Sequence, residues 1–150
     1  MNDKQKRARA YLSQIGYLEA KAENQMEVIE RLRELSKTPK TQAMDGVRVR
    51  VQSDEPAFVR LLELIDKRED ELTWTLQTLL ELQKQANVAL AEMDNSKHML
   101  LLIHRYYDYF TWSEIGDKLH ASKSTIKRWH EEALDEFKVP TCPVEVLKLT

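Results

Sequence analysis

Residues 111–137 read TWSEIGDKLHASKSTIKRWHEEALDEF and contain the signals for two short helices separated by a tight turn. The opening Thr-Trp-Ser-Glu has the spacing of a capping box, which predicts that the first helix begins at Trp112. The turn is expected near residues 119–121. Ser122 can cap the second helix, which we expect to run to about Phe137.

The apolar residues of this stretch predict how the two helices pack against each other. Helical spacing places one set of side chains on the inner face. The expected inward-facing residues are Ile115, Leu119, Ile126, Trp129 and Ala133. Gly116 lies where the two crossing helices must approach closely, and its missing side chain permits that approach. This arrangement is a helix-turn-helix.

The second helix of this motif begins with a polar, basic face. Its members are Ser122, Lys123, Ser124, Thr125, Lys127 and Arg128. In DNA-binding helix-turn-helix proteins the first residues of the second helix meet base edges in the major groove. Hydroxyl groups and long cations suit bases and phosphates, and a helix N-terminus favours phosphate. We therefore expect binding to double-stranded DNA; the alternative is a helical hairpin with a solvated charged face.

The segments on either side of the motif are short. The sequence Asp-Asn-Ser at 94–96 predicts a helix boundary, because each of these side chains can cap a helix. A further short helix is expected over residues 98–109. Its inward-facing residues would be Leu101, Leu102 and Tyr106. Two prolines in residues 139–150 predict an irregular tail.

Two long helices are predicted before the motif, over residues 3–37 and 54–93. In the first, apolar residues recur at steps of three and four. The second has a seven-residue repeat formed by Phe58, Ile65, Leu72, Leu79, Ala86 and Met93, flanked on the same side by Leu62, Leu76 and Leu90. A strict repeat of seven implies supercoiling around another helix. That helix is either the first one, in an antiparallel hairpin, or a helix of a second copy.

Residues 38–53 break the helical pattern and are interpreted as a basic connector. The chain is therefore expected to be all-α, with a long antiparallel helical hairpin or coiled coil followed by a small helix-turn-helix domain. The expected divisions are residues 1–93 for the helical arm with its connector, 94–138 for the helix-turn-helix and 139–150 for the tail. Residues 54–93 carry nine acidic and four basic residues, so this helix is strongly acidic.

Composition excludes several classes of protein. With 32% charged residues and no apolar run near the ~20 residues of a membrane span, an integral membrane protein is excluded. A single Cys allows no internal disulfide or cysteine-based zinc site. His130-Glu131 begins like a zinc-protease motif, but position 134 is Leu. We therefore expect no metal, no cofactor and no catalytic residue, and a cytoplasmic protein.

The motif resembles region 4 of sigma-70-type factors, which reads the −35 promoter element. The resemblance rests on Thr-x-x-Glu-Ile-Gly from Thr111, on Leu119, Ser122-Lys123 and Ile126-Lys127, and on Ala133-Leu134. Over nearly its whole length the chain resembles phage-encoded regulators of the RinA and ArpU type. That match rests on size and layout, with Tyr11-Leu12, residues 32–36, Val51-Gln52-Ser53 and Arg105-Tyr106-Tyr107 in support.

The resemblance implies base contacts by Lys123, Ser124 and Arg128, and phosphate contacts by Thr125 and Lys127. Two departures from the sigma-factor pattern limit what the resemblance implies. His120 replaces the usual turn glycine, and Ser124 stands where sigma factors often carry an acid, so the −35 consensus is not carried over.

The expected function is sequence-specific transcription regulation, of phage late genes in a bacterial host cell. The acidic arm would serve self-association or contact with host RNA polymerase, and a homo-oligomer held by the seven-residue repeat is expected. The basic N-terminus, with Lys4, Lys6, Arg7 and Arg9, is either a further phosphate contact or a solvated end. Two rival functions are a phage terminase small subunit and a protein-binding adaptor without a DNA role.

Overall fold

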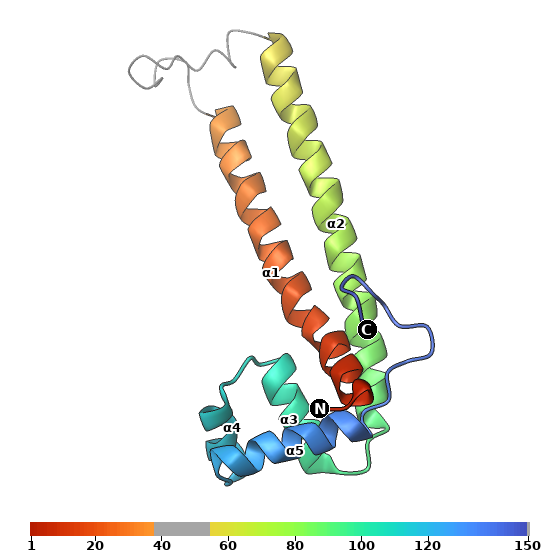
Figure 1. The fold of residues 1–150 in the computed structure, drawn as a ribbon. Coiled ribbons are helices and arrows are strands. Elements are labelled where there is room, and N and C mark those ends of the chain that lie inside the picture. The colour runs from red at the N-terminus through yellow and green to blue at the C-terminus, as the bar shows by residue number, and fades with distance from the viewer. Residues whose placement is uncertain (38–54, 150) are drawn as a thin grey trace. The chain divides into compact units, whose positions relative to one another are not determined.

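The computed structural model describes residues 1–37 and 55–149 (Figure 1). Its helices are α1 (Asp3–Lys37), α2 (Glu55–Ala91), α3 (Ser96–Tyr106), α4 (Trp112–Leu119) and α5 (Lys123–Glu136). The described residues contain no strand, which confirms the predicted all-α class with a helical hairpin and a small helix-turn-helix. The predicted basic connector at 38–53 lies outside the described residues.

The contacts divide the chain into two compact units. One unit contains residues 20–77, which are the second part of α1 and the first part of α2. The other contains residues 1–19 and the chain from residue 78 onward, so it includes α3, α4 and α5. The domain limits expected from the sequence, after residues 93 and 138, stay predictions.

In the unit formed by residues 20–77, the two helical segments run antiparallel (Figure 1). An ion pair between Arg33 and Glu69 joins them. The buried apolar side chains of this unit are Ala22, Ile29, Leu61 and Ile65. Burial of apolar surface along both segments is the main stabilising contribution here, because an exposed ion pair contributes only ~0–1 kcal/mol.

The seven-residue repeat of α2 is buried in part. Ile65, Leu79 and Ala86 are buried, whereas Phe58, Leu72 and Met93 are half-buried. Of the three leucines that flank the repeat in sequence, Leu90 is buried, whereas the exposed fractions of Leu62 and Leu76 are 42% and 44%. The buried column comprises Leu61, Thr75, Leu82 and Ala89, three residues after repeat positions. Leu90, four residues after Ala86, is also buried, as expected for a seam in which steps of three and four alternate.

The second unit has one continuous core. Its buried residues from the three short helices are Leu101, Leu102, Tyr106, Ile115, Ile126, Ala133 and Leu134, with Phe137 after α5. The first half of α1 adds Ala8, Tyr11, Leu12, Ile15 and Leu18, and the end of α2 adds Leu79, Leu82, Ala86, Ala89 and Leu90. The short helices therefore share a core with segments of both long helices.

The predicted boundary at residues 94–96 is confirmed, but α3 begins at Ser96, two residues before the predicted start, and its end also differs. The Asn95 side chain accepts hydrogen bonds from the N–H groups of Lys97 and His98. The helix ends at Tyr106, three residues before the predicted end. Tyr109 has a φ of 59°, which is left-handed and incompatible with a continuing helix. Tyr109 lies in the loop before α4, where its hydroxyl donates a hydrogen bond to Glu19.

The tail after α5 has no helix but is held by two glutamines. Gln14 is fully buried, and its Oε1 accepts hydrogen bonds from the N–H groups of Val146 (2.7 Å) and Leu147 (3.0 Å). Gln85 Nε2 donates to the carbonyl of Cys142 at 3.0 Å. These bonds satisfy backbone groups of the tail that secondary structure does not pair.

The turn between α4 and α5 depends on two residues. His120 adopts the left-handed conformation with φ 56° and ψ 49°, which glycine adopts most readily. The N–H of Ala121 donates to the carbonyl of Gly116 at 3.0 Å. A Cβ on Gly116 would lie 2.7 Å from the Ala121 carbonyl oxygen. The turn, more than the crossing of the helices, therefore requires glycine at position 116. The contact with α5 is less close, because the same Cβ would lie 3.8 Å from Ile126 Cγ1.

We predict that His120→Gly stabilises the protein. A left-handed conformation costs an L-residue ~1–2 kcal/mol, and the greater flexibility of unfolded glycine offsets part of that gain. The free energy of unfolding should rise by ~0.5–1 kcal/mol in urea melts followed by circular dichroism. His120→Val should lower it, because β-branched residues tolerate this conformation poorly. A loss of stability in His120→Gly would contradict a strained turn.

Candidate nucleic-acid interface

The predicted capping box fixes the start of α4. The N–H of Glu114 donates to Thr111 Oγ1 at 3.1 Å, and the N–H of Thr111 donates to Glu114 Oε1 at 3.1 Å. Two of the N–H groups at the helix start that have no partner within the helix are thereby satisfied. The predicted start at Trp112 is confirmed.

Ser122 caps α5, as the sequence predicts. Its Oγ accepts a hydrogen bond from the N–H of Thr125 at 3.2 Å and donates one to Thr125 Oγ1 at 2.8 Å. The hydroxyl of Ser122 therefore already has partners within the protein. Ser122, one of the predicted DNA-binding residues, therefore caps the helix and has no free hydroxyl for DNA. The Thr125 hydroxyl accepts the bond from Ser122, so its own hydrogen can still be donated to a DNA acceptor.

The rotation of α5 differs from the sequence prediction at one position. Ile126 and Ala133 are buried as predicted, but Trp129 is only half-buried, with Lys97 Nζ lying 5.3 Å from the centroid of its ring. The core position is taken by His130, whose exposed fraction is 4%. Successive helical residues are ~100° apart, so the middle of the buried face falls nearer His130 than Trp129.

His130 connects the three short helices. Its Nε2 lies 2.7 Å from the hydroxyl oxygen of Tyr106 on α3, and its ring meets that of Trp112 on α4 edge-on, at a centroid distance of 4.8 Å. Burial, and next the positive charges of Arg105 and Arg9, together lower the pKa of His130 to about 4. At neutral pH His130 is therefore uncharged. The spacing from Ile126 to His130 to Ala133 is the sequence signal that could have identified this core histidine.

The face of α5 opposite its buried residues carries most of the predicted DNA-binding side chains. Lys123, Ser124, Lys127 and Arg128 are exposed, and Thr125 is half-buried. Acidic residues follow in the second half of the helix, at Glu131, Glu132, Asp135 and Glu136. Positive charge is thus concentrated at the N-terminal half of α5, the end that enters the major groove in helix-turn-helix complexes.

Arg128 has one ion-pair partner on its own helix. Its Nε lies 3.8 Å from Glu132 Oε1, and the two side chains are 67% and 51% exposed. Glu132 also lies 3.5 Å from Nε2 of His98 on α3. Exposed pairs of this kind contribute ~0–1 kcal/mol, so Arg128 can leave Glu132 for another acceptor at little cost.

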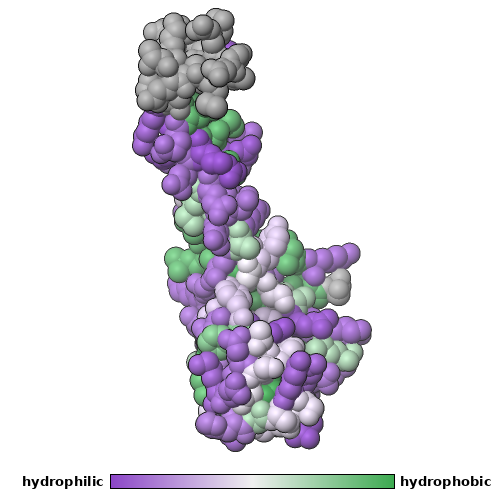
Figure 2. Space-filling model, turned by 90° about the vertical axis from the view of Figure 1, so that its left-hand side faces the viewer, coloured by the Kyte–Doolittle hydropathy of each residue, from purple (hydrophilic) through white to green (hydrophobic). Residues whose placement is uncertain are grey.

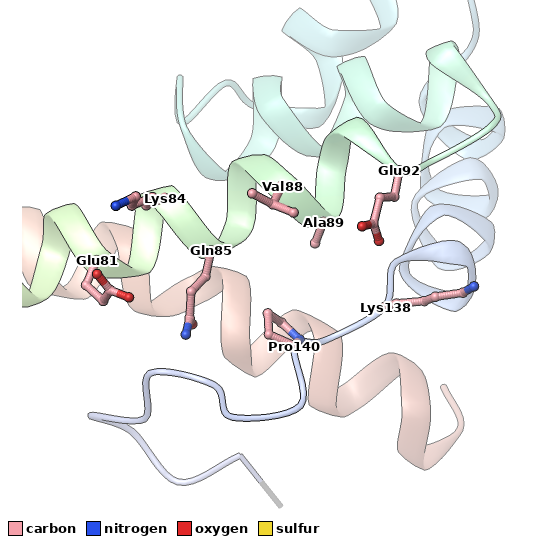
Figure 3. Close-up of a pocket in the computed structure, with 8 residues that line it drawn as sticks. All are labelled: Glu81, Lys84, Gln85, Val88, Ala89, Glu92, Lys138 and Pro140. Carbon is pink, nitrogen blue, oxygen red and sulfur yellow. The ribbon is translucent and has the colours of Figure 1, made fainter.

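A cavity of about 410 Å³ lies between α2 and the chain after α5 (Figure 3). Its charged lining residues are Glu81, Lys84, Glu92 and Lys138. Two acids against two bases give this cavity no attraction for phosphate. In the described part of the chain, no group of three His, Cys, Asp or Glu residues could hold a metal ion, and no helix is long and apolar enough to span a membrane.

We predict that acid destabilises the second unit through His130. Its pKa is about 4 in the folded protein against 6.5 for an ordinary histidine, so the unfolded chain binds more protons as the pH falls below 6.5. The free energy of unfolding should therefore drop by ~2 kcal/mol between pH 7 and pH 5 from this group alone.

His130→Gln is the control for this loss. The variant should be less stable at pH 7, because a core contact changes, yet it should lack this component of the pH dependence. Urea melts of both proteins at pH 7 and pH 5 give the comparison. The same loss of stability in both proteins would show that His130 is not the titrating group.

The family model described as Sigma-70, region 4 matches residues 89–138, a third of the chain. No curated protein and no solved structure matches the chain. The match spans the end of α2, the three short helices and the turn described above. Residues 89–138 therefore form a helix-turn-helix like that of sigma-70 region 4, which is a DNA-binding domain without catalytic function.

Proposed function

We propose that this protein is a sequence-specific transcription regulator that inserts the N-terminal half of α5 into the major groove of DNA. The observation that carries the proposal is the division of α5 into a buried face and an exposed basic face within a sigma-70 region 4-like motif. A rigid core beneath the helix supports base recognition, because it holds the exposed side chains in a fixed orientation.

The exposed side chains divide into two roles. Lys123, Ser124 and Arg128 would contact base edges, since lysine and arginine suit guanine and a serine hydroxyl can bond to several bases. Thr125 and Lys127 would contact phosphates, which position the protein on DNA without specifying sequence. Ser122 would act through the helix cap that it forms with Thr125.

The biological setting that we propose is control of phage late genes in the cytoplasm of a bacterial host cell. Its support is the resemblance of the chain's layout to regulators of the RinA and ArpU type. The helical arm lies almost wholly outside the matched residues 89–138. We propose that its acidic α2 either contacts host RNA polymerase or joins two copies of the chain.

The decisive test compares alanine variants of the exposed cations of α5. Lys123→Ala and Arg128→Ala should each cost ~1–3 kcal/mol on the best site and relax sequence preference. Lys127→Ala should weaken all sequences alike and reduce the salt slope by about 0.9, the contribution of one phosphate. A selection from random duplexes gives the best site, and titrations against it and a scrambled duplex give the affinities.

Lys138→Ala is the matched control. It removes the same charge from an exposed residue beyond the end of α5, so it should leave both affinity and sequence preference unchanged. Unaltered DNA binding in all three α5 variants would refute α5 as the recognition helix. Absence of any salt-dependent DNA affinity in the wild type would favour a protein-binding adaptor.

We also propose that the protein acts as a homo-oligomer, because one small DNA-binding module seldom offers enough interface for tight specific binding. Leu79 and Ala86 of the seven-residue repeat are buried within one chain and are not available to a second copy. Other apolar side chains are exposed, among them Met26, Leu62, Trp74 and Leu76. In Figure 2 the apolar residues form separate patches on a mainly hydrophilic surface.

We predict that Leu62→Lys with Leu76→Lys reduces self-association while the helices persist. These two residues lie on one side of α2, and Leu64→Lys on the other side is the control. Analytical ultracentrifugation at micromolar concentration should show an oligomer for the wild type and the control. A wild-type monomer of 17.6 kDa, with and without DNA, would refute self-association. A large ring would instead favour a terminase small subunit.

A further inference from the structure

A second basic feature lies beside α5, at a cavity of about 320 Å³ in the unit that contains the short helices. Three basic side chains from three different helices line it: Arg9 of α1, Arg105 of α3 and Lys127 of α5. The one acidic residue that lines it is Glu131. Like charges held close together repel one another, so a bound anion would stabilise this arrangement.

Two of the three cations have no partner that would neutralise them. Among the described residues, neither the guanidinium of Arg9 nor the ammonium of Lys127 forms an ion pair or a side-chain hydrogen bond. Both residues are exposed, so their head groups are open to a ligand from solvent.

The third cation is held in place. The guanidinium of Arg105 stacks on the Trp112 ring, 3.9 Å from its centroid, and Nη1 donates to the carbonyl of Phe110 at 3.0 Å. A guanidinium has five N–H donors, so donors remain for a second acceptor. An arginine fixed in this way loses little side-chain entropy when it binds an anion.

The floor of the cavity contains His130, which is uncharged at neutral pH. Its pKa is lowered to about 4 by burial, and next by Arg105 and Arg9. The positive charges of Arg105 and Arg9 therefore both act on the His130 ring. With three cations and one acid, the lining carries a net charge of about +2, which suits a small anion of high charge density.

We propose that this cavity binds a single phosphoryl group, and that the group is a phosphate of the DNA strand that passes beside α5. The assignment to DNA rests on the proposed function. Lys127 belongs both to the cavity and to the exposed face of α5. Gln5 Nε2 donates to the backbone carbonyl of Glu131 at 3.0 Å, so a hydrogen bond joins the first turns of α1 to α5. Arg9, one turn after Gln5, therefore lies beside Lys127 at the edge of the proposed DNA-binding face.

The first experiment compares Arg9→Ala with Arg7→Ala in the full-length protein. Side chains two residues apart on a helix point about 160° away from each other, and Arg7 does not line the cavity. Both changes remove one charge from an exposed residue of α1. Arg9→Ala should weaken specific and scrambled duplexes alike by about tenfold at low salt, and reduce the salt slope by about 0.9. Arg7→Ala should change neither the affinity nor the slope by a comparable amount.

The second experiment titrates the wild type and Arg9→Ala with inorganic phosphate. Nuclear magnetic resonance follows the Arg9 Nε–H and the His130 ring, and sulfate and chloride at equal ionic strength serve as references. Saturable shifts of the Arg9 Nε–H and the His130 ring in the wild type, with no saturable shift of the His130 ring in Arg9→Ala, would support the cavity as a phosphoryl site. An absence of saturable shifts together with equal DNA binding by Arg9→Ala and Arg7→Ala would overturn it.

The two experiments also separate the source of the phosphoryl group. Saturable phosphate binding with equal DNA affinities for the two arginine variants would overturn the DNA assignment and point to a phosphorylated small molecule. If the wild type bound no DNA, the proposed function would fail, and the phosphate titration alone would decide whether the cavity is a phosphoryl site.

Discussion

The hydrogen bond between the Tyr106 hydroxyl and His130 Nε2, 2.7 Å long and buried, determines how α5 is presented to solvent. It joins α3 to α5 inside the core, and the edge contact of Trp112 brings α4 to the same point. A buried polar group must keep its partner, so α5 cannot rotate without losing this bond. The fixed rotation buries one face of α5 and exposes Lys127 and Arg128 on the other.

The first turns of α1 belong to the same compact unit as the helix-turn-helix, although nearly the whole chain separates them in sequence. Gln5 bonds to the backbone of α5, and the rings of Tyr11 and Phe137 lie 5.9 Å apart in the core. A basic N-terminal segment that is packed in this way differs from a frayed, solvated end. It gives the DNA-binding unit an additional cation, Arg9, in a defined place.

Local signals in the sequence were sufficient to predict most helix boundaries. The capping side chains of Thr111 and Ser122 act on neighbouring N–H groups, so their effect can be recognised without knowledge of the fold. The end of α3 could not be predicted in this way, because Tyr109 reaches a left-handed conformation in a loop where its hydroxyl bonds to Glu19 of α1. Contacts from distant segments override local helical preference at such positions.

The sequence by itself determined the all-α class, the capped helices, the helix-turn-helix and the basic start of its second helix. These features follow from residue spacing and from interactions within a few residues. The tertiary structure decided that His130 rather than Trp129 takes the central core position, and that Arg9 and Arg105 meet Lys127 at one cavity. Packing between separate helices sets both outcomes, because rotation and long-range proximity depend on which surfaces bury together rather than on the pattern along any one helix.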